Sequence, residues 1–168
     1  MIAYYSRKGM NYLNGRIVDL QEGNTAVAAG IIQKITGGDI FEIKTVKRYP
    51  ADYTEATEVA LSEKMHNQRP ALSAFVDNMA RYDVIILGYP NWWGTFPMAV
   101  FTFLEAYDLS GKSILPFCTH EGSGLGTSER DIRKLCPDVK IVPGLALRGG
   151  SVTNSMGTIQ TWLDKAAR

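Results

Sequence analysis

Two adjacent tryptophans, Trp92 and Trp93, stand in the loop sequence Gly-Tyr-Pro-Asn-Trp-Trp-Gly-Thr at residues 88–95. An indole is flat and polarisable, so the pair could stack on a planar ring. The run Val84–Leu87 before the loop is short, β-branched and bounded by turn residues, which is typical of a strand buried on both faces. Pro97, after the loop, suits the first residue of a helix. Because ligands bind at the carboxyl ends of strands in open α/β sheets, this loop is a candidate binding site. The alternative is that both indoles only fill the core at the end of the sheet.

A second group of polar residues surrounds the expected start of a helix near residue 25. Ser6, Asn24 and Thr25 offer hydroxyl and amide groups, and Lys8 adds a positive charge. The free N–H groups and partial positive charge of a helix N-terminus bind phosphate. Either Asn24 or Thr25 would cap this helix. The group therefore indicates a phosphate subsite, and the alternative is an ordinary capped helix.

A third loop, residues 119–126, is rich in glycine and begins with Thr119 and His120. Its pattern Gly-Ser-Gly-Leu-Gly is not the dinucleotide-binding fingerprint, because it does not follow the first strand and its spacing is one residue short. Glycines here would let backbone N–H groups approach a planar ligand closely. His120 is either part of such a site or a solvated loop residue.

The elements that would position these loops alternate along the chain. Apolar runs predict strands at 2–5, 39–43, 84–87, 113–119 and 139–147, the second of them at an edge of the sheet. Helical spacing predicts helices at 25–36, 54–67, 98–107, 127–136 and 153–167. Pro116 lacks an N–H donor, so the ladder of the fourth strand should begin at or after it. The fifth strand should be interrupted near Pro143 and Gly144. Strict alternation predicts a parallel sheet sandwiched between helices, in a single domain over residues 1–168.

Composition and charge narrow the classes of partner. The chain has 168 residues, a charged share of 21% and a net charge of +1, so it lacks the clustered positive charge that nucleic acids and anionic membranes require. No motif supports metal catalysis. Cys118 and Cys136 form no C-x-x-C pair and suggest no disulfide framework. No segment reaches the length of a membrane span, and a strand from residue 2 leaves no room for a signal peptide. A cytoplasmic protein is therefore expected.

The sequence resembles the flavodoxin family over nearly its whole length. The most specific parts of the resemblance are residues 88–95 and the segment Pro-Phe-Cys-Thr-His-Glu-Gly-Ser-Gly at 116–124. The family pattern opens with a strand followed by Ser/Thr-x-Thr-Gly-Asn-Thr. Here that motif is split between Ser-Arg-Lys-Gly at 6–9 and Gly-Asn-Thr at 23–25, with residues 10–22 inserted. The resemblance implies an α/β flavodoxin-like three-layer sandwich with a five-stranded parallel sheet in the order 2-1-3-4-5.

The resemblance also implies a cofactor, flavin mononucleotide (FMN), held without a covalent bond. It places the phosphate near Ser6, Asn24 and Thr25, together with Lys8. One side of the flavin ring would be lined by Pro90, Asn91, Trp92, Trp93 and Gly94. The pyrimidine end of the ring would be bordered by Thr119, His120, Glu121, Gly122, Ser123 and Gly124. Backbone N–H groups near the ring would favour the reduced flavin, and Glu121 would oppose it if close. No side chain is expected to act as nucleophile or general base.

Two functions of different classes follow from this resemblance. The protein is either an electron carrier that passes electrons to a redox partner protein, or an NAD(P)H-dependent oxidoreductase that reduces a flavin or quinone. Dedicated carriers of the family tend to be strongly acidic, so the net charge of +1 favours the enzyme mildly. No nicotinamide pocket is evident, although the insertion at 10–22 or the loop at 49–53 could wall one. A flavin-free receiver domain is a third alternative, but Tyr5-Ser6 stands where receivers carry acidic metal ligands. The expected state is a monomer or a homodimer.

Overall fold

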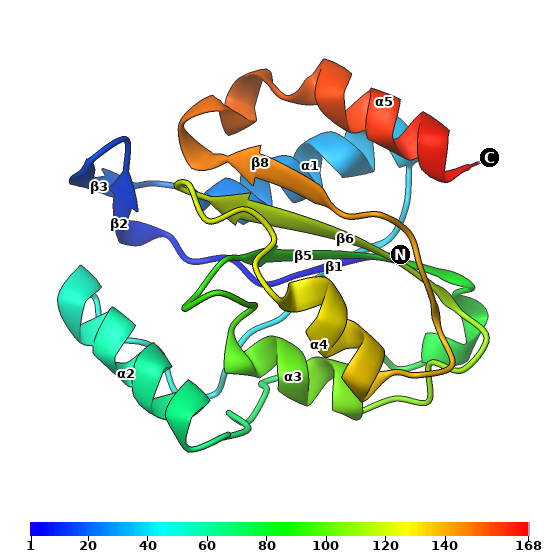
Figure 1. Ribbon diagram of the computed structural model, residues 1–168, viewed down its shortest axis with the longest axis horizontal. Helices are drawn as coiled ribbons and strands as arrows, with labels where there is room; N and C mark the ends of the chain where they lie inside the picture. Colours follow the sequence, from blue (N-terminus) through cyan, green and yellow to red (C-terminus); the bar gives the residue numbers. More distant parts are fainter. Residues whose placement is uncertain (168) are drawn as a thin grey trace.

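The computed structural model describes residues 1–167, in which strands and helices alternate along most of the chain (Figure 1). The strands are β1 (Ile2–Tyr4), β2 (Gly9–Leu13), β3 (Arg16–Leu20), β4 (Ile40–Glu42), β5 (Val84–Pro90), β6 (Ser113–His120), β7 (Lys140–Ile141) and β8 (Leu145–Arg148). The helices are α1 (Asn24–Thr36), α2 (Tyr53–Met65), α3 (Met98–Glu105), α4 (Ser128–Leu135) and α5 (Met156–Ala166), with short 3-10 helices η1 (Met79–Arg81) and η2 (Gly149–Asn154). No helix within residues 1–167 is long and apolar enough to cross a bilayer.

The main sheet is parallel, in the order β4-β1-β5-β6, and both β7 and β8 pair with β6. Strand β1 lies between β4 and β5, so that Ile2 stands opposite both Ile40 and Ile86. With β7 and β8 counted as one interrupted strand, this is the predicted order 2-1-3-4-5. In β5 every residue from Ile85 to Tyr89 is buried, as a central parallel strand requires. The parallel arrangement brings the carboxyl ends of β1, β5 and β6 to one edge of the sheet.

Pro116 lies inside β6 and does not delay its pairing. The ladder with β5 begins at Ser113, so the prediction that it begins at or after Pro116 is wrong. The Ser113 N–H donates to the Asp83 carbonyl, and the Thr119 carbonyl accepts from the Asn91 N–H, at the two ends of β5. The odd-numbered residues of β6 therefore bond on the β5 side. The even-numbered residues, which include Pro116, turn their main-chain groups to the other neighbouring strand. On that side the partner strand is interrupted between Ile141 and Leu145, as the sequence predicted. The missing N–H of Pro116 faces this interruption and therefore costs no ladder hydrogen bond.

Alternate residues of the strands face two separate cores. Ile86 and Phe117 pack in a cluster with residues of α1 and α5, whereas Ile85, Leu87 and Cys118 pack with residues of α3 and α4. Figure 1 shows α1 and α5 together on one side of the sheet and α3 and α4 on the other. This division follows from the two-residue period of a strand, and it fixes the sheet between two layers of helices.

Residues 9–20, which include most of the predicted insertion, form an antiparallel hairpin that stands apart from the main sheet (Figure 1). Its strands join through Asn14 and Gly15, which have φ angles of 50° and 85°. Positive φ at both central residues is the geometry of a type I′ turn, for which Asn-Gly is a preferred sequence. The Asn-Gly pair is thus a local hairpin signal that the interpretation of residues 10–22 as a plain insertion missed.

Candidate functional site

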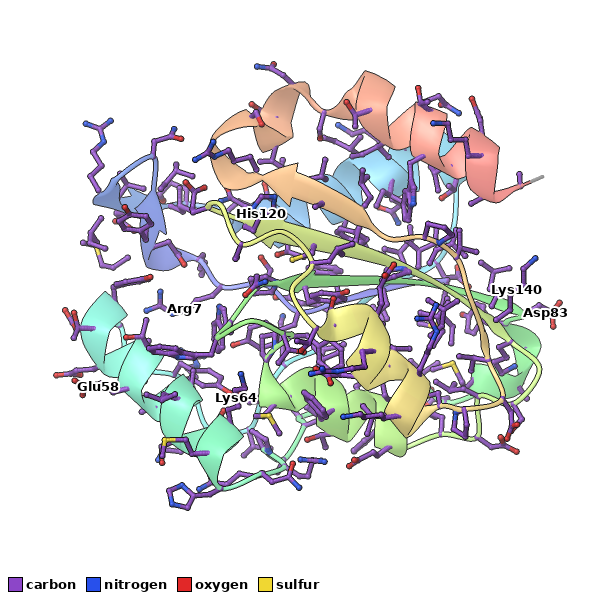
Figure 2. All side chains as sticks on the ribbon, in the orientation of Figure 1. Arg7, Glu58, Lys64, Asp83, His120 and Lys140 are labelled. Carbon is purple, nitrogen blue, oxygen red and sulfur yellow. The ribbon has the colours of Figure 1, made fainter. Side chains whose placement is uncertain are left out.

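A cleft lies beside the hairpin, where the carboxyl ends of β1, β5 and β6 meet. It consists of two adjoining cavities, the Ser6 cavity of about 340 Å³ and the Trp93 cavity of about 420 Å³. Both are lined by Arg7, Asn11, Tyr53, Asn91, Trp92 and Ser123. Figure 2 shows Arg7 and His120 at this end of the molecule, and Asp83 and Lys140 at the opposite end. The cleft therefore stands where the rule for α/β sheets places a ligand.

Almost all of the predicted site residues line this cleft. Those of the Ser6 cavity are Ser6, Asn24, Thr25, Pro90, Asn91, Trp92, Thr119, His120, Glu121, Gly122 and Ser123. Trp93 and Gly94 line the Trp93 cavity. Lys8 instead lines a neighbouring cavity of about 840 Å³, here called the Lys8 cavity. Gly124 lines neither part of the cleft, and its carbonyl accepts a hydrogen bond from Asn91. Three loops that are distant in sequence thus meet in one place.

Helix α1 begins in the cleft without a cap from its own side chains. Its N-cap is Gly23, so the prediction that Asn24 or Thr25 caps the helix is wrong. A Cβ at Gly23 would lie 2.2 Å from Ser6 Oγ, which leaves room only for glycine. Ser6 Oγ accepts a hydrogen bond from the Ala26 N–H at 3.1 Å. Within the described chain the N–H groups of Asn24 and Thr25 have no partner, so this helix end keeps free donors of the kind that bind phosphate.

Thr25 and Thr119 join α1 to β6 at the floor of the cleft. Their hydroxyl oxygens lie 2.7 Å apart in a hydrogen bond, and both side chains are buried. A buried hydroxyl that already has a partner is satisfied and holds its element in place. These two threonines therefore fix the position of the free helix end relative to the sheet.

The double-tryptophan loop closes through a tight turn. Trp92 N–H donates to the Thr95 carbonyl at 2.8 Å, and the residues between them, Trp93 and Gly94, have φ angles of 55° and 86°. A positive φ is strained for a bulky residue such as Trp93. The Trp93 indole N–H donates to the carbonyl of Thr57 on α2 at 2.9 Å, which holds the side chain in this conformation. Strain of this kind is typical of ligand-binding sites; here the Trp93 indole is directed to α2, whereas the Trp92 indole packs against Tyr5 and Tyr49.

Trp92 lies between the core and the cleft. Its ring packs edge-on against Tyr5, with centroids 5.3 Å apart, and against Tyr49 at 5.1 Å. The side chain is only partly buried and also lines both cavities. Trp92 therefore packs against the core with one part of its ring and lines the cleft with another.

Glu121 lines the Ser6 cavity, and its two carboxylate oxygens differ in their partners. Its Oε2 accepts a hydrogen bond from the Asn14 N–H at the tip of the hairpin, at 2.9 Å. Its Oε1 is buried and has no partner among the residues that the structure describes. Leaving a buried acceptor unpaired costs about 1–3 kcal/mol. A ligand with an N–H or O–H group at this point would remove that cost.

His120 is held neutral beside Glu121. Its Nδ1 accepts a hydrogen bond from the Gly122 N–H at 2.9 Å, which requires an unprotonated nitrogen. Burial lowers the pKa of His120, the positive charge of Arg148 lowers it further, and Glu121 opposes both effects. The imidazole therefore shapes the loop that follows β6 and adds no positive charge to the cleft near neutral pH.

Arg7 lines both cavities of the cleft, although the sequence interpretation did not include it. Its guanidinium donates to the carbonyls of Pro50 at 2.9 Å and Ala51 at 3.0 Å, and also to the carbonyl of Met10. Figure 2 shows Arg7 between the hairpin and α2. Burial lowers the pKa of this guanidinium, yet an arginine stays charged at physiological pH. The one sequence signal for it was its place between Ser6 and Lys8.

The family model described as flavodoxin matches residues 20–166. The chain belongs to the flavodoxin family. Comparison with curated proteins finds no match.

Solved structures of this fold support the assignment to the flavodoxin family. A protein from Bacteroides eggerthii DSM 20697, assigned as a flavoprotein, has a TM-score of 0.78 and 29% identity, over 99% of this chain and 96% of that chain. One from Bacteroides uniformis ATCC 8492, assigned likewise, has a TM-score of 0.74 and 28% identity, over 98% and 96%. A flavoprotein from Lactobacillus acidophilus NCFM, solved in complex with FMN, has a TM-score of 0.62 and 21% identity, over 93% and 96%. This last similarity is one of fold.

In this member of the flavodoxin family the two halves of the split motif meet again in space. The hairpin separates Ser6 from Gly23 in sequence, yet the Ser6 hydroxyl contacts the first turn of α1 through the Ala26 N–H. The inserted residues therefore do not separate the hydrogen-bond donors of the motif. They also add a wall beside these donors, because Asn11 and Tyr12 of β2 line the Ser6 cavity.

Proposed function

We propose that this protein binds FMN in the cleft without a covalent bond and transfers electrons through it. The observation that carries the proposal is the joint presence, in one cleft, of free donors at the start of α1 and a tryptophan wall at the end of β5. FMN has both an anionic end and a planar end, so it matches both features. FMN is also the ligand of the Lactobacillus acidophilus flavoprotein, which shares the fold.

The donor set fits the phosphate of FMN. The Ser6 hydroxyl and the free N–H groups of Asn24 and Thr25 would hold it, assisted by the dipole of α1. Hydrogen bonds to a charged group contribute about 1.5–3 kcal/mol each. Lys8 lies in the adjoining Lys8 cavity, where its charge would act at longer range.

Other residues of the cleft fit the planar ring and its polar edge. Trp92 would contribute about 1 kcal/mol by stacking, beyond the apolar area that it buries. The loop at 119–124 would border the ring's pyrimidine end, and Glu121 Oε1 would accept a hydrogen bond from a ring N–H or a ribityl hydroxyl. Such a bond would satisfy the one buried polar side-chain atom that lacks a partner in residues 1–167.

The bound FMN would supply the redox chemistry, and the chain would bind it, orient it and shield it from water. The two cysteines do not take part as nucleophiles. Burial raises the pKa of Cys118 to about 12 and that of Cys136 to about 11, so neither thiol is ionised near neutral pH. The contribution of the protein is therefore positional and electrostatic.

An electron carrier is the first candidate, and an NAD(P)H-dependent flavin or quinone oxidoreductase is the second. Two observations favour the second. The net charge of +1 lacks the acidic field that steers a carrier to a basic partner. The Lys8 cavity adjoins the cleft through Ser6 and Arg7, and both the hairpin and the loop at 49–51 line it. The cavity is lined by four basic residues and by three acidic ones, Asp19, Glu22 and Glu42. Lys44 pairs with Glu42 at 2.8 Å and Arg7 donates to backbone carbonyls, so Lys8 and Arg48 would be the residues to bind the phosphates of a nicotinamide dinucleotide.

Anaerobic reduction separates the two candidates. The protein is loaded with FMN, and NADH or NADPH is added under argon while the visible spectrum is recorded. Loss of the yellow colour within seconds would support the oxidoreductase. A flavin that ignores both nucleotides, but is reduced by dithionite in two separate one-electron stages, would support the carrier and point to a redox partner protein.

A variant with residues 10–22 replaced by a short Gly-Ser linker tests the wall of the Lys8 cavity. If this variant oxidises NADPH as fast as the wild type, the hairpin does not form a nicotinamide site. The state of assembly, monomer or homodimer, and the expected cytoplasmic location remain predictions.

A further inference from the structure

Two tyrosines contact Trp92 in nearly the same way from the core side. Tyr5 packs edge-on at a centroid distance of 5.3 Å and an interplanar angle of 78°, and Tyr49 at 5.1 Å and 83°. Burial raises the pKa of both phenols well above the ordinary value of 10. As electron donors to Trp92 the two rings are therefore equally placed.

The two tyrosines differ in what their hydroxyl groups contact. The Tyr49 hydroxyl donates to Glu63 Oε2 across 2.6 Å, which is a short hydrogen bond to a carboxylate. The Tyr5 hydroxyl makes no hydrogen bond within residues 1–167, and Tyr5 lines the Lys8 cavity. Only Tyr49 thus has a carboxylate in place for its proton.

Glu63 is suited to accept that proton. It is half-buried on α2, and burial raises its pKa, which makes the carboxylate a stronger base, although the hydrogen bond from Tyr49 works in the opposite direction. Glu63 also lines a cavity of about 520 Å³, the Glu63 cavity, which is distinct from the cleft. Tyr49 lines the Glu63 cavity and the Lys8 cavity, and its ring contacts Trp92, which lines the cleft.

We propose that Trp92, Tyr49 and Glu63 form a path that refills an electron vacancy created at Trp92 by a one-electron oxidant in the cleft. The inference rests on the proposed binding of FMN, because the oxidant is light-excited oxidised FMN. One electron leaves the Trp92 indole for the excited flavin. One electron then passes from Tyr49 to Trp92, while the Tyr49 O–H bond breaks and its proton moves to the Glu63 carboxylate.

The step is balanced in electrons and protons. The flavin gains one electron, Trp92 returns to its starting state, Tyr49 becomes a neutral radical and Glu63 becomes a neutral acid. An oxidised tyrosine that keeps its proton carries a positive charge and is strongly acidic. Because a buried site disfavours that charge, the proton must leave when the electron does. Tyr5 has no carboxylate partner, so the path runs through Tyr49 and carries the oxidising equivalent out of the cleft toward the Glu63 cavity.

Transient absorption after a blue flash on the FMN-loaded protein tests this path. We expect a neutral tyrosyl radical in the wild type, its loss in Tyr49→Phe, and its retention in Tyr5→Phe, the matched control. Glu63→Gln keeps the shape of the side chain but removes the base, and should slow formation of the radical about a hundredfold. Heavy water should slow it in the wild type.

Electron paramagnetic resonance of wild-type protein grown with ring-deuterated tyrosine assigns the radical without any substitution. A radical that remains on tryptophan in the wild type, or an equal tyrosyl signal in Tyr49→Phe, would overturn the path. An unchanged rate in Glu63→Gln would overturn the role of Glu63. A protein that binds no FMN would instead contradict the proposed function, and this is seen in the visible spectrum before any flash is applied.

Discussion

The side-chain amide of Asn91 donates to the carbonyl of Gly124 across 2.8 Å and thereby joins two walls of the cleft. Its Oδ1 accepts from the Gly94 N–H at 3.0 Å, so the same side chain also closes the double-tryptophan turn. A cofactor-binding role for Asn91 would therefore be indirect. It holds the loop after β5 and the loop after β6 at a fixed separation, which sets the width available to a planar ring.

Replacement of Asn91 by alanine should loosen both loops. The change leaves the Gly94 N–H without a partner and the Gly124 carbonyl with only the weak Cys118 thiol donor, so the free energy of unfolding should fall by about 1–3 kcal/mol. FMN affinity should fall with it. Chemical denaturation of Asn91→Ala measures the first effect, and Asn78→Ala, on an exposed residue without a side-chain cap bond, is the control. Equal denaturation midpoints for the two variants would contradict the role of Asn91.

Replacement of Ser6 by alanine should weaken the binding of FMN but not that of riboflavin, which lacks the phosphate. Loss of one hydrogen bond to a charged group costs about 1.5–3 kcal/mol, which is roughly a tenfold to hundredfold weaker affinity for FMN. Any general loss of order around Ala26 affects both ligands alike, so the ratio of the two dissociation constants is the measurement. Ser110→Ala, in an exposed turn before β6, should leave that ratio unchanged. A constant ratio in Ser6→Ala would place the phosphate elsewhere.

Two glycine-to-alanine changes should shift stability in opposite directions. Gly94 has a φ of +86° with open space around an added Cβ, so alanine there should cost about 1–2 kcal/mol through backbone strain alone. Gly30 lies inside α1, also with open space, so alanine there should stabilise by about 0.5–1 kcal/mol. Thermal or chemical unfolding measures both. Stabilisation by Gly94→Ala would contradict the positive φ of Gly94 in this turn.

His120 should make the fold less stable in mild acid. Its pKa is lowered in the folded state, chiefly by burial, so as the pH falls the unfolded chain takes up the proton first. The contribution is fully present above the ordinary histidine pKa of about 6.5 and is lost as the pH falls below it. An NMR titration of the imidazole protons should place the midpoint of His120 below that value. A midpoint above it would mean that Glu121 outweighs burial and Arg148.

Local sequence signals predicted the buried strands and helices well, because apolar β-branched runs and helical spacing are properties of neighbouring residues. The order of the strands came from the family resemblance. The hairpin was missed although the Asn14-Gly15 pair is a local signal for a hairpin turn. Pro116 was misjudged because the effect of its missing donor depends on a break in another strand, which no local pattern around the proline shows.

The loops that follow the strands were correctly predicted to form the candidate site. The prediction was incomplete for residues whose role depends on contacts between segments distant in sequence. The three loops at the carboxyl ends of β1, β5 and β6 do converge, since parallel strands place them at one edge. Arg7 was missed because two of the carbonyls that it contacts, those of Pro50 and Ala51, lie more than forty positions away. The cap of α1 was misassigned because the close approach of Ser6 to Gly23 depends on tertiary packing.

Removal of the Trp92 indole should weaken the hold on the flavin ring. Stacking contributes about 1 kcal/mol beyond area burial, so Trp92→Ala should raise the dissociation constant for FMN by about tenfold or more. Phe75→Ala, on an exposed aromatic outside the cleft, is the matched control. Equal affinities in the two variants would exclude Trp92 as the stacking residue.

The most direct test of the account is a titration of the purified protein, freed of bound flavin, with FMN, followed by flavin fluorescence and visible absorbance. We predict saturation at one FMN per chain, with quenched fluorescence, because the ring lies against Trp92. We also predict release of intact FMN on denaturation, because no covalent bond forms. A protein that leaves FMN fluorescence unchanged at every ratio, and from which FMN separates freely on gel filtration, would contradict the central claim.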